Sequence, residues 1–143
     1  MREILFRGKA INGGQWLYGH FTEYAGTSQI WTATDDGTWN SIVDPATVGQ
    51  YTGLTDKNGV KIFEGDIVKL KNSTPKGEWI AVVEFGNPNA SYSWSWQLKY
   101  LSGDNFNRDV LLWVDMEECG ATCEVIGNIH DNPELLKEVA EHG

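Results

Sequence analysis

One continuous segment, residues 50–70 (QYTGLTDKNGVKIFEGDIVKL), constrains the fold of this chain more than any other. Within it, residues 56–59 (DKNG) supply the Asn and Gly that a tight turn between strands requires, because both residue types tolerate a positive φ angle. Residues 60–63 are expected to return as a short extended stretch, and residues 64–66 (EGD) to lead into the next strand. The segment therefore predicts short strands joined by tight turns.

The strand at residues 67–70 has the alternation of a half-buried strand. Ile67 and Lys69 fall on one face, and Val68 and Leu70 fall on the other. A solvated lysine face opposite an apolar face is typical of a strand in a small β-barrel.

The rest of the chain has the composition of a mainly β protein, with 16 glycines, seven tryptophans and 12% aromatic residues. Further strands are predicted at residues 3–7, 16–24, 29–34, 38–43, 78–85, 92–98, 110–114 and 123–129. The first two of these should pair as a hairpin, and so should the next two, through the DDG turn at residues 35–37. Pro45 is expected to end the strand that precedes it.

The C-terminal part predicts a bulge and a short helix. Gly127 marks a bulge or a close packing contact within the last strand. Asn132 is a suitable N-cap, with Pro133 at the first helical position, and the helix should run to about Ala140. Its apolar side chains, among them Leu135, should cover the open end of the barrel. The chain is thus expected to contain a β-hairpin subdomain at residues 1–46 and a small barrel with a helix at residues 47–143, or to form one compact domain.

Composition and charge restrict the function. The chain has 143 residues and a net charge of −9, a field that repels phosphate backbones and makes nucleic-acid binding unlikely. A local basic patch at Lys69, Lys71 and Lys76 remains the alternative. There is no apolar run of about eighteen residues, and the charged N-terminus does not resemble a signal peptide. We therefore expect a cytoplasmic protein without a membrane segment.

The two cysteines do not define a metal site. Cys119 and Cys123 are separated by three residues and are expected to be free thiols, with a local disulfide or a bound metal as the alternatives. The nearest histidine, His130, would give only three ligands without the paired spacing of zinc motifs. No metal or cofactor is predicted.

No catalytic constellation is predicted either. Residues 56–59 followed by Glu64 and Asp66 superficially resemble a calcium loop, but the predicted flanks are strands, so a turn is favoured. Asp66 is expected to accept hydrogen bonds from backbone amides at this turn rather than to act as an acid or base. His20, His130 and His142 are interpreted as structural residues.

The aromatic surplus is the main functional signal. Trp31, Trp39, Trp94 and Trp96 lie beside polar loops, and tryptophan is enriched where protein interfaces gain most of their binding energy. These four residues are therefore predicted to form a contact surface. The alternative is that all seven tryptophans fill the core or an interface between identical chains.

Three blocks of sequence, residues 1–10 (MREILFRGKA), 50–70 and 125–136 (VIGNIHDNPELL), together resemble the YopX family of phage and prophage proteins. The resemblance implies an SH3-like β-barrel with a short C-terminal capping helix, association into oligomers, and a place in the cytoplasm of a bacterial host. It implies no reaction and transfers no catalytic residues. The stretch between Lys71 and Cys123 matches none of these blocks.

From these observations we expect a non-enzymatic protein-interaction module that associates with itself or with a host or phage protein. One alternative is a nucleic-acid-associated accessory protein, because small barrels often stack bases on aromatic side chains. Another is an enzyme, which would need a deep pocket holding at least two titratable groups with perturbed pKa values.

Overall fold

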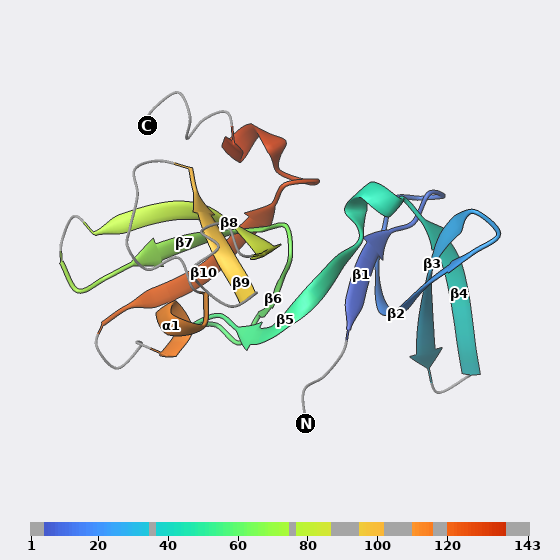
Figure 1. Ribbon diagram of the computed structural model, residues 1–143, viewed down its shortest axis with the longest axis horizontal. Coiled ribbons are helices and arrows are strands. Elements are labelled where there is room, and N and C mark those ends of the chain that lie inside the picture. The colour runs from blue at the N-terminus through green and yellow to red at the C-terminus, as the bar shows by residue number, and fades with distance from the viewer. Residues whose placement is uncertain are drawn as a thin grey trace. The chain divides into compact units, whose positions relative to one another are not determined.

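The chain is mainly β and divides into two compact units, Met1–Gly53 and Leu54–Gly143 (Figure 1). The computed structural model describes residues 5–34, 37–74, 77–86, 95–101, 110–115 and 120–136. All strand pairings among these residues are antiparallel. In this part of the chain, no helix is long and apolar enough to cross a membrane.

In the first unit β1 to β4 form an antiparallel meander and β5 pairs with the other side of β1, so the strand order is β4-β3-β2-β1-β5. Both predicted hairpins are confirmed, because β1 pairs with β2 and β3 pairs with β4. β2 and β3 also pair, through a turn at Ala25 and Gly26 in which Ala25 has a φ of 53°. The elements are β1 (Phe6–Lys9), β2 (Trp16–Tyr24), β3 (Thr27–Thr34), β4 (Gly37–Val43), the 3-10 helix η1 (Pro45–Thr47) and β5 (Gly49–Thr55).

The sheet of the first unit rolls up because β4 returns to β1. Ala10 and Val43 form an antiparallel bridge, and two backbone hydrogen bonds flank it, from Ile11 N to Ile42 O at 3.1 Å and from Asp44 N to Lys9 O at 2.9 Å. These bonds enclose a small core of Ala10, Leu17, Ile30 and Val43, with Phe6, Phe21 and Val48 packed against it. We call this contact between β1 and β4 the seam.

Pro45 ends β4 as predicted, and η1 fixes the chain beside the seam. The Asp44 carboxylate accepts from Ala46 N at 3.0 Å, which caps the 3-10 turn. The Thr47 hydroxyl donates to Asp44 O at 2.6 Å and accepts from Lys9 N at 2.9 Å. The turn therefore connects β4 to β5 and is itself bonded to β1.

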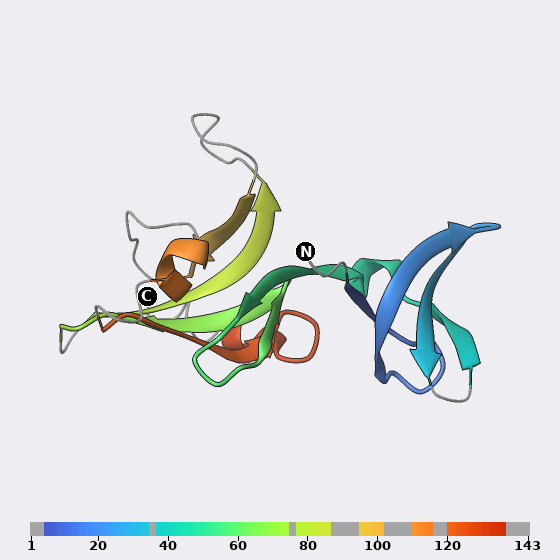
Figure 2. The same ribbon diagram turned by 90° about the horizontal axis from the view of Figure 1, so that it is seen from below.

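The second unit is built on a four-stranded sheet with order β10-β7-β8-β9. Among the described residues no pairing joins β9 to β10, so the sheet is not closed into a barrel. Figure 2 shows α1 in the curve formed by β8 and β9. The elements are β6 (Lys61–Phe63), which neighbours β5, then β7 (Asp66–Lys71), β8 (Glu78–Gly86), β9 (Ser95–Tyr100), α1 (Val110–Asp115) and β10 (Thr122–Asn128).

The prediction of a strand at residues 110–114 is wrong, because this segment is α1. Val110 and Trp113, three residues apart, are both buried, whereas Leu111 is 45% exposed. That spacing places the two buried side chains on one face of a helix. A short apolar run such as VLLWV fits a buried strand equally well by pattern alone, which explains the error.

The predicted bulge and the predicted start of the C-terminal helix are confirmed. The register between β10 and β7 shifts between Val125 and Gly127, which is the predicted bulge. A helical turn begins at Pro133, and Leu135 N donates to Asn132 O at 3.0 Å. The predicted end of this helix near Ala140 lies outside the described residues.

Candidate functional site

One face of the sheet in the first unit carries most of the exposed aromatic side chains of that unit. In the strand registers, His20 lies opposite Trp31, and Trp31 lies opposite Asn40, so these positions share a face. The core residues Leu17, Ile30 and Val43 alternate with them and point to the other face. We call the first set the outer face, which among the side chains described comprises Arg7, Lys9, Trp16, Tyr18, His20, Thr22, Tyr24, Thr27, Gln29, Trp31, Asn40 and Ile42.

Large apolar groups on the outer face are open to solvent. Tyr18 is 45% exposed, Tyr24 75%, Trp31 38% and Ile42 46%. The sheet supplies a rigid platform for them, because their backbone is held in ladders on both sides of β2 and β3. Exposed rings on a rigid platform bury large area at little cost in conformational entropy when a partner covers them.

Side-chain hydrogen bonds hold the outer face in place. The indole N–H of Trp31 donates to the Thr22 hydroxyl at 2.9 Å, which fixes the ring orientation. The Asn40 amide donates to Gln29 Oε1 at 2.6 Å. These bonds link β2 to β3 and β3 to β4, so part of the rotamer entropy of these side chains is already lost before a partner binds.

At the β1 end of the outer face, Trp16 covers two cations. The guanidinium carbon of Arg7 lies 4.7 Å from the centre of the Trp16 ring, and Lys9 Nζ lies 5.7 Å from it. Both distances are within the range of cation–π contacts. No Asp or Glu occupies an outer-face position, although the whole chain has a net charge of −9. The outer face is therefore an acid-free surface in an acidic protein.

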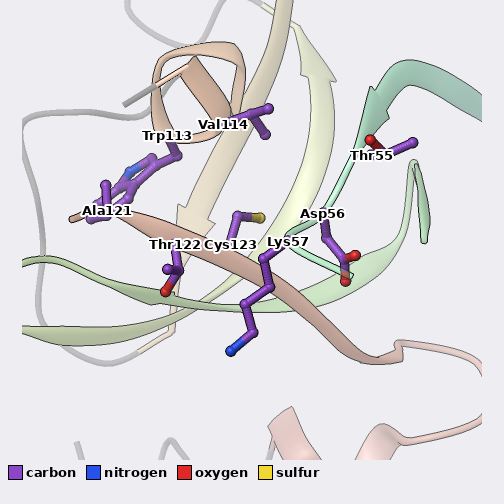
Figure 3. Close-up of a pocket in the computed structure, with 8 residues that line it drawn as sticks. All are labelled: Thr55, Asp56, Lys57, Trp113, Val114, Ala121, Thr122 and Cys123. Atoms are coloured by element: carbon purple, nitrogen blue, oxygen red, sulfur yellow. The ribbon is translucent and has the colours of Figure 1, made fainter. Parts of the chain in front are cut away.

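The second unit contains a small pocket beneath α1 (Figure 3). It encloses about 100 Å³ and is lined by Thr55, Asp56, Lys57, Trp113, Val114, Ala121, Thr122 and Cys123. This volume holds only a few water molecules, since water occupies about 30 Å³ in the liquid. Two groups in its wall are candidates for a chemical role: the Asp56 carboxylate as an acid or base, and the Cys123 thiol as a nucleophile.

The Asp56 carboxylate is fully engaged as a hydrogen-bond acceptor. Its Oδ1 accepts from Asn58 N at 2.8 Å and Val60 N at 2.9 Å, and its Oδ2 accepts from Val125 N at 2.9 Å. Lys57 N donates to Cys123 O at 3.0 Å in the same region. Asp56 thus forms the predicted turn and also joins this turn to the edge of β10.

The Cys123 thiol is a poor nucleophile. Burial and, to a smaller extent, the nearby carboxylates of Asp56 and Asp66 together raise the pKa of Cys123 to about 12. Since the thiolate is the reactive form, the thiol remains protonated at neutral pH. The other cysteine of the chain, Cys119, lies outside the described residues.

The other predicted polar residues have structural surroundings. Asp66 is buried, and its Oδ2 accepts from Phe63 N at 2.7 Å, which confirms its predicted role at the turn. Lys69 and Lys71 each lie 3.8 Å from the carboxylate of Glu78, and Lys76 lies outside the described residues. Among the residues that the structure describes, no three His, Cys, Asp or Glu side chains gather as metal ligands.

The three histidines occupy different surroundings. His20 is exposed on the outer face. His130 is partly buried in the turn after β10, where its backbone N–H donates to Asn128 Oδ1 at 3.0 Å. His142 lies outside the part of the chain that the structure describes.

The four tryptophans predicted as a contact surface do not gather at one place in the described structure. Trp31 lies on the outer face, whereas Trp96 is 7% exposed in the core of the second unit, where its ring centre lies 4.8 Å from that of Phe85. Trp39 lies opposite Thr32 in the backbone register, and its side chain is outside the described residues, as is all of Trp94. The predicted surface therefore retains Trp31 among the side chains described.

Sequence reasoning did not include Tyr18, Tyr24 and Ile42 in the contact surface. The period-two alternation of β2 was a usable signal for Tyr18, because it places Tyr18 on the same face as Trp16 and opposite Leu17. Ile42 could not be assigned in this way, since its face depends on the pairing register with Gln29.

Comparisons with known proteins agree with this fold. A sequence model of the YopX protein family matches residues 6–137. The crystal structure of protein EF1440 from Enterococcus faecalis is similar, with a TM-score of 0.50 and 24% sequence identity, over 95% of this chain and 99% of that chain. At this identity the likeness concerns the fold alone. Among curated proteins, none matches the chain.

We predict that Asp56→Ala lowers the free energy of unfolding by about 3 kcal/mol or more. It leaves three backbone N–H groups without their acceptor, and a buried unsatisfied donor costs about 1–3 kcal/mol. Urea denaturation measures the change. Asp44→Ala is the matched control, because Asp44 caps one exposed N–H and should cost only about 1 kcal/mol. Equal losses in the two variants would contradict the role assigned to Asp56.

We also predict that Cys123 resists thiol reagents at pH 8 in the folded protein and reacts fully in denaturant. A Cys119→Ser background leaves Cys123 as the one thiol to be followed. Because the pKa of Cys123 is raised from 9.0 to about 12, its contribution to stability is complete below pH 9 and decreases as the pH rises from 9 towards 12. Cys123→Ala should lack this contribution. Rapid labelling of the folded chain at pH 8 would contradict the assignment.

Proposed function

The chain belongs to the YopX family, and from this premise together with the outer face we propose that it is a non-enzymatic protein-interaction module that also associates with itself. The observation that carries the proposal is the outer face, where exposed rings are held rigidly and no acidic side chain is present. Aromatic groups surrounded by polar ones are typical of the central part of protein interfaces. The partner would be a second copy or a host or phage protein in the bacterial cytoplasm.

The chemistry of the second unit supports a binding role over a reaction. Asp56 is committed to three backbone amides, and the pKa of Cys123 lies far above neutral pH. The groups that line the pocket therefore stabilise the fold, and the interaction would depend on the surface of the first unit.

An SH3-like barrel is the scaffold that we propose, and the first unit supports it best. Its strands β1 to β4 form a meander, β5 pairs with β1, the seam brings β4 back to β1, and η1 interrupts the path between β4 and β5. The sequence had suggested the barrel for residues 47–143. The seam favours residues 1–53 for the barrel instead.

A second candidate function is binding of single-stranded nucleic acid. The outer face favours it through Lys9 beside Trp16 and through its exposed rings, which are the elements of a base-stacking surface. The net charge of −9 opposes it. A gel shift with labelled single strands should detect no retardation, whereas retardation that decreases steeply with added salt would favour this function over the first.

The outer face can be tested by removing two rings. Tyr18→Ala combined with Trp31→Ala should weaken binding of another protein at least tenfold, because removing an aromatic hot spot costs about 2 kcal/mol or more. Affinity capture from host cells measures this binding, and sedimentation equilibrium of the wild type measures self-association. Val60→Ala, on an exposed side chain of the second unit, is the control that should retain binding. Unchanged binding of other proteins by the double variant would overturn the proposed surface, and a strictly monomeric wild type would overturn self-association.

A further inference from the structure

One edge of the first unit's sheet has an open side. β4 pairs with β3 along its whole length, in a continuous register from Ser28 and Val43 to Thr34 and Gly37. On its other side it is bonded only at the seam, among the described residues, through Ile42 O and Asp44 N. Residues 38–41 therefore form an edge that neither β1 nor another described strand covers.

The direction of the backbone groups follows from the seam. In an antiparallel strand the N–H and C=O of one residue point to the same side, and the direction alternates from residue to residue. Since Ile42 O and Asp44 N point away from β3, the groups of Asn40 and Thr38 must do so as well. These two N–H groups and two C=O groups have no backbone partner among the described residues.

This edge lacks the usual protection against pairing with another chain. Natural edge strands are protected by charged side chains, proline, bulges or very short length. β4 has seven residues, GTWNSIV, without charge or proline, and its register with β3 shows no bulge. The edge is therefore suited to accept another strand.

We propose that β4 is a self-association edge, at which β4 of one copy pairs antiparallel with β4 of a second copy across a two-fold axis. The inference rests on the proposed self-association and names its surface. A second copy fits because every chain has a net charge of −9, so two copies approach with least repulsion where neither has a charged side chain. A two-fold contact also requires a self-complementary surface, and a uniform row of backbone donors and acceptors is one.

The backbone groups of β4 that are not yet bonded determine the register of the pair formed by two copies. Ile42 O is already bonded to Ile11 N, which leaves Thr38 and Asn40. Thr38 of each copy then lies opposite Asn40 of the other, which forms four hydrogen bonds centred on Trp39. In this register the Trp39 positions of the two copies face each other as a non-hydrogen-bonded pair. The outer faces of both copies become one continuous surface, with Asn40 on both sides of the two-fold axis.

Asn40→Pro tests the edge, with Asn40→Ala as the matched control. Proline removes the outward N–H and places its ring on the edge, whereas alanine retains the N–H. Both variants lose the side-chain bond to Gln29, so that loss cancels in the comparison. By sedimentation equilibrium of the full chain, Asn40→Pro should raise the dimer dissociation constant at least tenfold over Asn40→Ala. Circular dichroism verifies that both variants are folded.

A cysteine pair tests the register even if the proline variant does not fold. In a Cys119→Ser background, Trp39→Cys should form a disulfide-linked dimer under mild oxidation, because non-hydrogen-bonded antiparallel partners have Cα atoms about 4.5 Å apart. Ser41→Cys is the control. Its own copy would lie roughly 13 Å away along the strand, so it should not form the disulfide.

The outcomes separate this inference from the proposed function. A wild type that is monomeric at micromolar concentration overturns both. A dimeric wild type in which Asn40→Pro associates as tightly as Asn40→Ala overturns the β4 edge and leaves self-association in place. A dimer that crosslinks through Ser41→Cys and not through Trp39→Cys overturns the register.

Discussion

The seam between β1 and β4 is the contact on which the first unit depends. Two backbone hydrogen bonds and one bridge bring residues far apart in sequence together, and the sheet rolls around Ile30 and Val43, both fully buried. The approach is close because Gly8 lies against Val43, where an added Cβ would come within 3.0 Å of Cγ2. The same contact also determines which backbone groups of β4 are bonded to β1. It uses the backbone of β4 at Ile42 and leaves Thr38 and Asn40 without a backbone partner among the described residues.

The two units differ in whether a turn is bonded to the edge strand of the sheet. At β10, the Asp56 carboxylate accepts the N–H of Val125 and the backbone N–H of Lys57 donates to Cys123 O, so a turn covers the edge. The same hydrogen bonds argue against a calcium loop at residues 56–59, because the Asp56 carboxylate already accepts from three backbone N–H groups. At β4 no comparable turn is present among the described residues, and the difference favours the first unit as the interacting one.

The local features of this fold could be predicted from the sequence, whereas the long-range ones could not. Turn residues such as Gly59 and Pro45 act on their own neighbours, so the turns, hairpins and the bulge at Gly127 followed from pattern alone. α1 was missed because five apolar residues in a row fit a strand or a helix equally well. The seam and the tie from Asp56 to Val125 join residues 33 and 69 positions apart, and no local pattern specifies such pairs.

The burial of the individual tryptophans could not be predicted from the sequence either. Composition shows that seven tryptophans exceed the need of one small core, but it does not show which of them lie inside. Trp96 alternates with polar residues as a surface ring would, yet it is buried in the same core cluster as Val110 and Trp113 of α1. Trp31 follows the apolar Ile30 and remains 38% exposed, because its face of the sheet is opposite the rolled core. A ring becomes available for binding through the face that the pairing register of its strand gives it, and the residues next to the ring do not specify which face the core covers.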